Sequence, residues 1–149
     1  MGRRSEVYIV STYPPRRCGV ATFAFDLATA LGRGRGEALG EGGSVRVIAM
    51  SERARRRPYG PEVGRIIRAS RKEDYAAAAD FVNDSPARVV SLQHEYGIFG
   101  GRAGGYVLTF LEHLAKPAVT TLHTVLAEPK PKQRDVLQRL CEVSAAVAV

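Results

Sequence analysis

The sequence has few cysteines and no long apolar run. Its two cysteines, Cys18 and Cys141, stand far apart and belong to no metal-spacing motif, so a structural disulfide is not expected. No stretch approaches the roughly 20 apolar residues that a membrane span requires. The apolar run at residues 7–10 is too short to be the core of a secretory signal. We therefore predict a cytoplasmic location.

Acidic residues are outnumbered, with 15 Asp and Glu against 22 Lys and Arg, which gives a net charge of +7. This balance favours anionic partners such as nucleotide phosphates, acidic lipids or nucleic acid. We interpret the clustered arginines named below as a solvated face of the protein. It stays open that they contact a phosphate or the inner face of a membrane. A nucleic-acid partner is not expected, because no aromatic residues are interleaved with the arginines. The clustered arginines are Arg53, Arg55, Arg56, Arg57, Arg65, Arg68 and Arg71.

The length of 149 residues suits one domain and leaves no room for a second. With 45% hydrophobic and 25% charged residues, the composition is that of an ordinary globular fold. The chain ends within an apolar stretch at residues 145–149, which we interpret as a further buried strand. We therefore expect residues 1–149 to be a truncated part of a longer protein.

Apolar residues alternate along the chain between strand-like and helix-like spacing. This alternation predicts a parallel sheet covered by helices on both faces. Residues 32–43 are rich in glycine and are predicted to form a flexible connection. Strands are predicted at 7–12, 44–50, 65–68, 88–93, 117–122 and 145–149. A helix is predicted at 72–82 from its high alanine content and few helix breakers. Three more are predicted from apolar stripes at Val20, Phe23, Ala24, Leu27 and Leu31, at Val107, Leu108, Leu111, Leu114 and Ala115, and at Val136, Leu137, Leu140 and Cys141.

Three polar segments, at residues 13–19, 94–105 and 123–128, follow predicted strands. Ligands of parallel α/β sheets bind beyond the carboxyl ends of the strands, so we expect these segments to frame one crevice. Gly19 precedes a helix whose free N–H groups suit a phosphate, and Arg16 and Arg17 would add positive charge. The alternative, that Gly19 only turns the chain after two prolines, carries equal weight.

Two histidines occupy predicted strand ends. His94 and Glu95 lie beside a loop with five glycines at 97–105, which permits a mobile loop or a close approach to substrate. His123 precedes Thr124, and a neutral imidazole there would donate to or accept from a sugar hydroxyl. For both histidines, a purely structural role stays open.

A metal site is not predicted. Cys18, His94 and His123 would form a zinc site only if their loops met, and no short ligand spacing supports it. A Cys18 nucleophile is equally unsupported. His113, inside a predicted helix, is interpreted as a surface or packing residue, and no cofactor is expected.

Three strings resemble the N-terminal domain of retaining glycosyltransferases of family four, in particular a mannosyltransferase-like subgroup. They are STYPPRRCGVATF at 11–23, QHEYGIFGG at 93–101 and TLHT at 121–124. The resemblance spans essentially the whole chain. It implies a Rossmann-like parallel sheet with helices on both faces, the N-terminal half of a GT-B fold in which two such domains face a cleft.

The resemblance also implies roles for individual residues. The first domain holds mainly the acceptor and the second mainly the nucleotide sugar. His123, the predicted catalytic residue, matches a histidine that contacts the transferred sugar. The implied substrate-binding residues are Gly19 with Arg16 and Val20 toward the donor diphosphate, His94 with Glu95 and Tyr96 on the acceptor side, and Thr124 beside His123.

These roles lead to a prediction of hexose transfer from GDP-mannose or a UDP-hexose to a hydroxyl acceptor, with retention implied by the resemblance. The family's second domain carries two glutamates separated by seven residues, and this chain has no such pair and no such domain. Turnover by these 149 residues alone is therefore not expected. The alternative is a stand-alone Rossmann-like module that binds a nucleotide or effector without catalysis.

Overall fold

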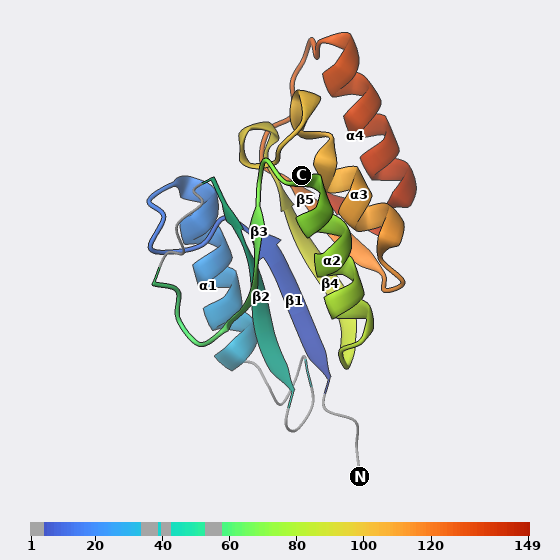
Figure 1. Ribbon diagram of the computed structural model, residues 1–149. Helices are drawn as coiled ribbons and strands as arrows, with labels where there is room; N and C mark the ends of the chain where they lie inside the picture. The colour runs from blue at the N-terminus through green and yellow to red at the C-terminus, as the bar shows by residue number, and fades with distance from the viewer. Residues whose placement is uncertain (1–4, 34–38, 40–42, 53–57) are drawn as a thin grey trace.

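The computed structural model describes residues 5–33, 39, 43–52 and 58–149. These residues form a six-stranded, all-parallel sheet in the order β3-β2-β1-β4-β5-β6 (Figure 1). This is the predicted Rossmann-like α/β arrangement. The strands are β1 (Glu6–Ser11), β2 (Ser44–Ser51), β3 (Val63–Arg68), β4 (Ala87–His94), β5 (Ala118–Leu122) and β6 (Ala146–Ala148). The helices are α1 (Gly19–Arg33), α2 (Lys72–Asn83), α3 (Tyr106–His113) and α4 (Pro131–Val143), with 3-10 turns η2 (Tyr96–Ile98) and η3 (Arg102–Gly104).

The helices cover the two faces of the sheet unequally. Helix α1 lies on one face, and α2, α3 and α4 lie on the other (Figure 1). This division follows from the strand order, because right-handed crossovers place a connection on opposite faces according to the direction in which the chain moves across the sheet. From β1 the chain adds strands in one direction, to β2 and β3. It then crosses back to β4 on the other side of β1 and adds β5 and β6 in the opposite direction, so β1 and β4 are the neighbours at which the strand order changes direction.

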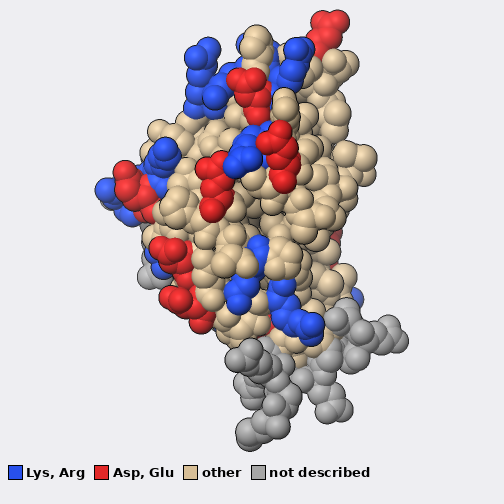
Figure 2. Space-filling model, turned by 90° about the vertical axis from the view of Figure 1, so that its right-hand side faces the viewer, with Lys and Arg blue, Asp and Glu red and all other residues tan. Residues whose placement is uncertain are grey.

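Charged side chains of both signs share the outer surface of the molecule. On the face presented in Figure 2, acidic and basic side chains lie beside one another. Arg139 of α4 lies 3.1 Å from Glu112 of α3 and 3.3 Å from Glu142. Arg68 pairs with Asp74, and Arg65 lies over the Phe81 ring. These basic side chains have partners within the fold, and the cluster at 53–57 lies outside the described residues.

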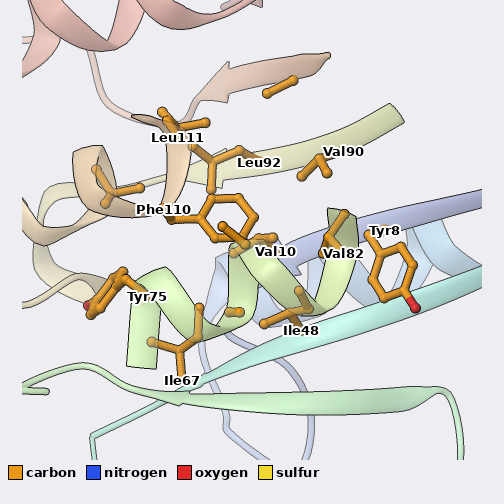
Figure 3. Packing of buried hydrophobic residues seen from close by; sticks show 14 of the residues in the cluster. Tyr8, Val10, Ile48, Ile67, Tyr75, Val82, Val90, Leu92, Phe110 and Leu111 are labelled. Atoms are coloured by element: carbon orange, nitrogen blue, oxygen red, sulfur yellow. The ribbon is translucent and has the colours of Figure 1, made fainter. Parts of the chain in front are cut away.

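Alternate residues of the central strand enter two separate apolar clusters. Tyr8 and Val10 pack into the larger cluster, beneath α2, α3 and α4, whereas Ile9 packs into a smaller one beneath α1. In Figure 3, Phe110 of α3 lies over the sheet close to Leu92 and Val10. The period of two along a strand explains this division, and nearly complete burial on both faces is typical of an inner parallel strand.

Helix α1 is shifted relative to its predicted buried stripe. Its fully buried residues are Ala21 and Ala24, and Phe23 is 44% exposed. Leu27 and Leu31 of the predicted stripe pack, partly buried, against the smaller cluster, whereas Phe23 lies on the flank of the helix. The prediction of a buried Phe23 was wrong for this reason.

Two predictions near the C-terminal end of the sequence were also wrong. Cys141 is exposed, because Val136 and Leu140 define the inner face of α4 and the next residue is turned about 100° away from it. All three residues of β6 are exposed, since this edge strand pairs with β5 alone. Helix α3 ends at His113, before Leu114 and Ala115.

Most of the predicted connection at 32–43 lies outside the described residues, although α1 continues through Gly32 to Arg33. Within the part of the chain that the structure describes, no helix is long and apolar enough to cross a membrane.

Candidate functional site

The carboxyl ends of β1, β4 and β5 meet at one edge of the sheet. These strands are neighbours, with Val10 opposite Leu92 and His94 opposite Leu122. The N–H of His123 donates to the His94 carbonyl at 3.0 Å, which continues the pairing of β4 and β5 one residue further. The three polar segments singled out in the sequence therefore leave the sheet side by side, at the point where the direction of strand order reverses.

The His123 side chain is held on the α1 side of this edge. Its Nε2 lies 2.8 Å from Oε1 of Gln93, a fully buried residue at the end of β4. Gln93 Nε2 in turn donates to the Ser91 hydroxyl at 2.9 Å. The Phe23 ring meets the imidazole edge to face, with centroids 4.9 Å apart. The half-buried imidazole is thus fixed between β4 and α1.

His94 occupies the opposite face of the sheet from His123. Successive side chains of β4 alternate between faces, so Gln93 points toward α1 and His94 into the larger cluster. There the His94 ring stacks on Phe99 and meets Tyr96 edge to face. It is fully buried, and neither ring nitrogen has a hydrogen-bond partner among the described residues. Burial lowers its pKa from 6.5 to about 4, with a smaller effect of His123 in the same direction and an opposing one of Glu95.

Glu95 links the segments that follow β4 and β5. One carboxylate oxygen accepts from the N–H of Tyr96 at 2.8 Å, and the other accepts from the Thr124 hydroxyl. Each oxygen retains a further lone pair for an outside donor. The contacts present in the structure make Glu95 a brace that sets the position of Thr124 relative to β4.

The beginning of α1 lies beside the end of β1. Gly19 is exposed, and a Cβ built on it would meet no atom within 4 Å. Arg16 pairs with Glu52 at 2.7 Å, while its Nη1 is buried with no hydrogen-bond partner among the described residues. An arginine with an unused donor beside a helix N-terminus favours anion binding, although the N–H groups of Val20 and Ala21 already hydrogen-bond the Cys18 sulfur.

The Cys18 thiol lies 3.3 Å from the Thr12 hydroxyl in a hydrogen bond. Burial raises its pKa, but the Thr12 hydrogen bond, backbone N–H groups and the Arg16 charge together lower the pKa below its usual value. No group of three or more His, Cys, Asp or Glu residues suited to a metal occurs among the described residues. Cys18, His94 and His123 do not form such a group.

The glycine-rich segment after β4 packs against the protein itself. Gly101 and Gly104 have φ angles of 79° and 72°, which L side chains rarely adopt. A Cβ on Gly100 would collide with the Ala69 carbonyl, and the Gly100 N–H donates to the Tyr75 hydroxyl at 2.9 Å. The close backbone approach expected of these glycines is therefore made to the end of β3.

A separate hollow lies at the other end of the sheet. It has a volume of about 820 Å³, and its lining includes Ser85, Arg88 and Lys116, close to where β4 and β5 begin. It shares no residue with the loops at the carboxyl edge. The convergent polar groups and unpartnered nitrogens described above are at the opposite edge, and these features are typical of a binding site.

Sequence reasoning overlooked two residues of the site, Gln93 and Phe23. Gln93 could have been found from the sequence, because residues two apart on a strand point to the same face and Gln93 lies two residues before Glu95. Thr121, the partner of Gln93 in the sheet register, belongs to the string at 121–124, and both Glu95 and this string had been singled out. Phe23 carried no such signal, since an apolar residue at helical spacing is normally buried.

Comparison with protein-family models, with curated proteins and with solved structures finds no match for this chain. The fold itself defines the class: a Rossmann-like domain with an all-parallel, six-stranded sheet in the order 3-2-1-4-5-6.

Proposed function

We propose that this chain is the acceptor-side half of a GT-B glycosyltransferase that transfers a hexose from a nucleotide sugar to a hydroxyl acceptor with retained configuration. The observation that carries the proposal is the meeting of three segments at one sheet edge. The strings at 11–23, 93–101 and 121–124, which resemble family-four enzymes, follow or end β1, β4 and β5, and these strands are adjacent. Retention and the two-domain cleft rest on the resemblance.

In this reaction the bond between the anomeric carbon and the diphosphate oxygen breaks, and a bond to the acceptor oxygen forms. The acceptor hydroxyl proton leaves with the nucleoside diphosphate, so that the products are the glycoside and the protonated diphosphate. Negative charge gathers on the departing diphosphate as the bond breaks. Donors positioned in advance for this charge would stabilise the transition state more than the ground state.

The beginning of α1 supplies such donors. Gly19, with Val20 and Arg16, would bind the diphosphate through the positive end of the helix, the backbone N–H groups of its first turn, of which that of Val20 is shared with Cys18, and the unpartnered Arg16 Nη1. Because Gly19 is exposed and its surroundings are open, a phosphate oxygen has room to approach its backbone.

The segment after β5 supplies the sugar contacts. His123 would form a hydrogen bond with the transferred hexose, and Thr124, braced by Glu95, would lie beside it. Glu95 would face the acceptor, whereas the Tyr96 ring packs against His94 and its hydroxyl is buried, so that Tyr96 would contribute through its backbone. Since His94 is fully buried, its contribution would come through its backbone, which already anchors His123.

The test uses a valine substitution at two glycines of the same helix. A Cβ added to Gly19 or to Gly32 would meet no atom within 4 Å, so neither substitution is expected to clash with the described part of the protein. In the protein at the full length that its gene encodes, Gly19→Val is expected to weaken GDP-mannose or UDP-glucose binding and transfer by about tenfold or more, a loss of roughly 1.4 kcal/mol. Gly32→Val, at the far end of α1, is the matched control.

Calorimetric titration and a transfer assay with the two donors provide the readout. Equal activity of the Gly19→Val and Gly32→Val variants would remove the diphosphate site from α1. Donor binding that responds to Gly19→Val, without transfer to any hydroxyl acceptor, would instead support a binding module without catalysis.

A further inference from the structure

The side chains around His123 determine which of its two ring nitrogens carries the proton. His123 Nε2 lies 2.8 Å from Gln93 Oε1. An amide oxygen only accepts hydrogen bonds, so this contact requires a proton on Nε2. In a neutral imidazole the other nitrogen, Nδ1, then carries a lone pair.

The Gln93 amide is itself held in place. The residue is fully buried, and its Nε2 donates to Ser91 Oγ at 2.9 Å, two residues earlier on the same face of β4. With the amide nitrogen turned toward Ser91, the oxygen faces His123. In this orientation Gln93 donates to Ser91 and accepts from His123. Because a serine hydroxyl also donates, the opposite amide orientation would give the opposite tautomer, and the NMR measurement below distinguishes the two.

The remaining contacts of His123 fix its orientation and leave Nδ1 unused. The backbone N–H is bound to the His94 carbonyl at 3.0 Å, and the Phe23 ring lies against the imidazole at an interplanar angle of 80°. Nδ1 has no hydrogen-bond partner among the residues that the structure describes, and the side chain is only partly buried. Its lone pair is therefore available to a donor from outside the protein.

We propose that Gln93 is a positioning residue that holds His123 in the Nε2–H tautomer, so that Nδ1 accepts a hydrogen bond from a hydroxyl of the bound hexose. The second half of this statement rests on the proposed function, and the first half does not. The neutral Gln93 amide selects one tautomer of neutral His123. A carboxylate in its place would favour the doubly protonated imidazolium, which accepts no hydrogen bond.

The protein contains its own reference for the opposite tautomer. His113 Nδ1 lies 2.8 Å from the Thr109 carbonyl, an acceptor, and this contact requires the Nδ1–H form. Nitrogen NMR of isotope-labelled histidine side chains distinguishes protonated from unprotonated ring nitrogens. The wild-type chain is expected to show His123 protonated at Nε2 and His113 protonated at Nδ1, each as a single tautomer.

Gln93→Leu removes the acceptor with little change in side-chain length, and His123 is expected to become a mixture of tautomers. Gln93→Glu is expected to show both His123 nitrogens protonated. The His113 signals should stay unchanged in both variants, which also reports that they are folded. A wild-type His123 that is protonated at Nδ1, or already mixed, overturns the proposal without reference to any variant. So does a single Nε2–H tautomer that persists in a folded Gln93→Leu protein.

Addition of GDP-mannose or UDP-glucose to the protein at the full length that its gene encodes tests the hexose contact. The His123 Nδ1 signal is expected to move toward that of a hydrogen-bonded acceptor while Nε2 stays in place, and Gln93→Leu is expected to weaken donor binding by about tenfold. A response at Nε2 alone overturns the proposed acceptor role. A third outcome is an Nε2–H tautomer whose two nitrogen signals do not respond to a donor that calorimetry shows to be bound. Gln93 then keeps its positioning role, and the hexose contact is refuted together with that part of the proposed function.

Discussion

His94 illustrates how the alternation of side chains between the two faces of a sheet decides the environment of each residue. Adjacent positions on β4 place Gln93 toward α1, in contact with His123, and His94 in an apolar core between Phe99 and Tyr96. Both side chains are fully buried, but only that of Gln93 has hydrogen-bond partners among the described residues. An imidazole in such surroundings stays neutral, because burial disfavours the charged form.

The stability of the fold should depend on pH through His94. Its pKa is lowered from 6.5 to about 4 in the folded chain. Between these values the unfolded chain binds the proton and the folded chain does not, so stability falls as the pH is lowered from 6.5 toward 4. The difference corresponds to a loss of up to about 3 kcal/mol in the free energy of unfolding.

A His94→Leu variant isolates this effect from the titration of the carboxylates, including nearby Glu95, and of His123. The variant should lose less stability over the same pH range. At pH 7 it should be at least as stable as wild type, because two unpartnered ring nitrogens are removed from the core. Urea unfolding of both proteins at several pH values provides the comparison. Parallel stability profiles would contradict a buried neutral imidazole at this position.

At the scale of elements, one carboxylate joins the end of β3 to the start of α2. Asp74, in the first turn of α2, accepts from the Arg68 backbone N–H at 3.0 Å and from its guanidinium at 2.6 and 2.8 Å. The Arg68 guanidinium hydrogen bond, followed by the backbone one, lowers the Asp74 pKa against the opposing effect of burial. The N-cap residue, Arg71, makes no capping hydrogen bond through its side chain. Asp74 therefore supports this junction together with the Tyr75 hydroxyl, which donates to the Ala69 carbonyl at 2.9 Å.

Asp74→Asn is expected to lower the free energy of unfolding by about 1 kcal/mol, because the charge-assisted pair and part of the interaction with the helix dipole are lost. The exposure of Arg68 keeps the value small. Glu73→Gln, which removes a charge from the same helical turn, is the control, and urea midpoints are the measurement. Equal losses would assign the effect to the helix dipole alone and not to the contact between Asp74 and β3.

The order of elements could be predicted from the sequence because each inner strand contains a short apolar or β-branched run, and the helices show apolar stripes or, at 72–82, a high alanine content. The weak strand at 65–68 was predicted close to its actual position in β3. The errors share a physical origin. The spacing of apolar residues identifies which side of a helix is apolar, but not how the helix is rotated about its axis relative to the sheet. Phe23 and Cys141 are each adjacent in sequence to a buried residue, Ala24 and Leu140. Burial of β6 depended on tertiary neighbours, about which local sequence carries no information.

The candidate site was predictable to the level of segments and not of contacts. That the segments at 13–19, 94–105 and 123–128 meet follows from parallel strands alone. The distinction between His94 and His123 does not follow from this rule, because both end a strand and only the register of β4 against β5 assigns their faces. The glycines after β4 were expected at a ligand, and Gly100 instead adjoins Ala69.

At the scale of the whole molecule, the sheet separates two regions that both carry positive charge. Arg16 belongs to the carboxyl edge, and Arg88 and Lys116 line the hollow near the beginnings of β4 and β5. Strands of six to eight residues at about 3.3 Å per residue place the two edges roughly 20 Å apart. This exceeds the screening length of about 8 Å at physiological ionic strength, so charges at one edge have little influence on a ligand at the other.

Charge substitutions should therefore separate the two edges. Arg16→Gln is expected to weaken binding of a nucleoside diphosphate several-fold, because it removes both the charge and the unpartnered Nη1 donor. The double substitution Arg88→Glu with Lys116→Glu should change the same affinity by less than about twofold at physiological salt. Calorimetry at low and physiological salt distinguishes a local contact from a general field, since only the field fades with added salt. If the double variant lost most of its affinity at both salt concentrations while Arg16→Gln retained it, the anion site would belong to the hollow, and the proposed role of α1 would have to be abandoned.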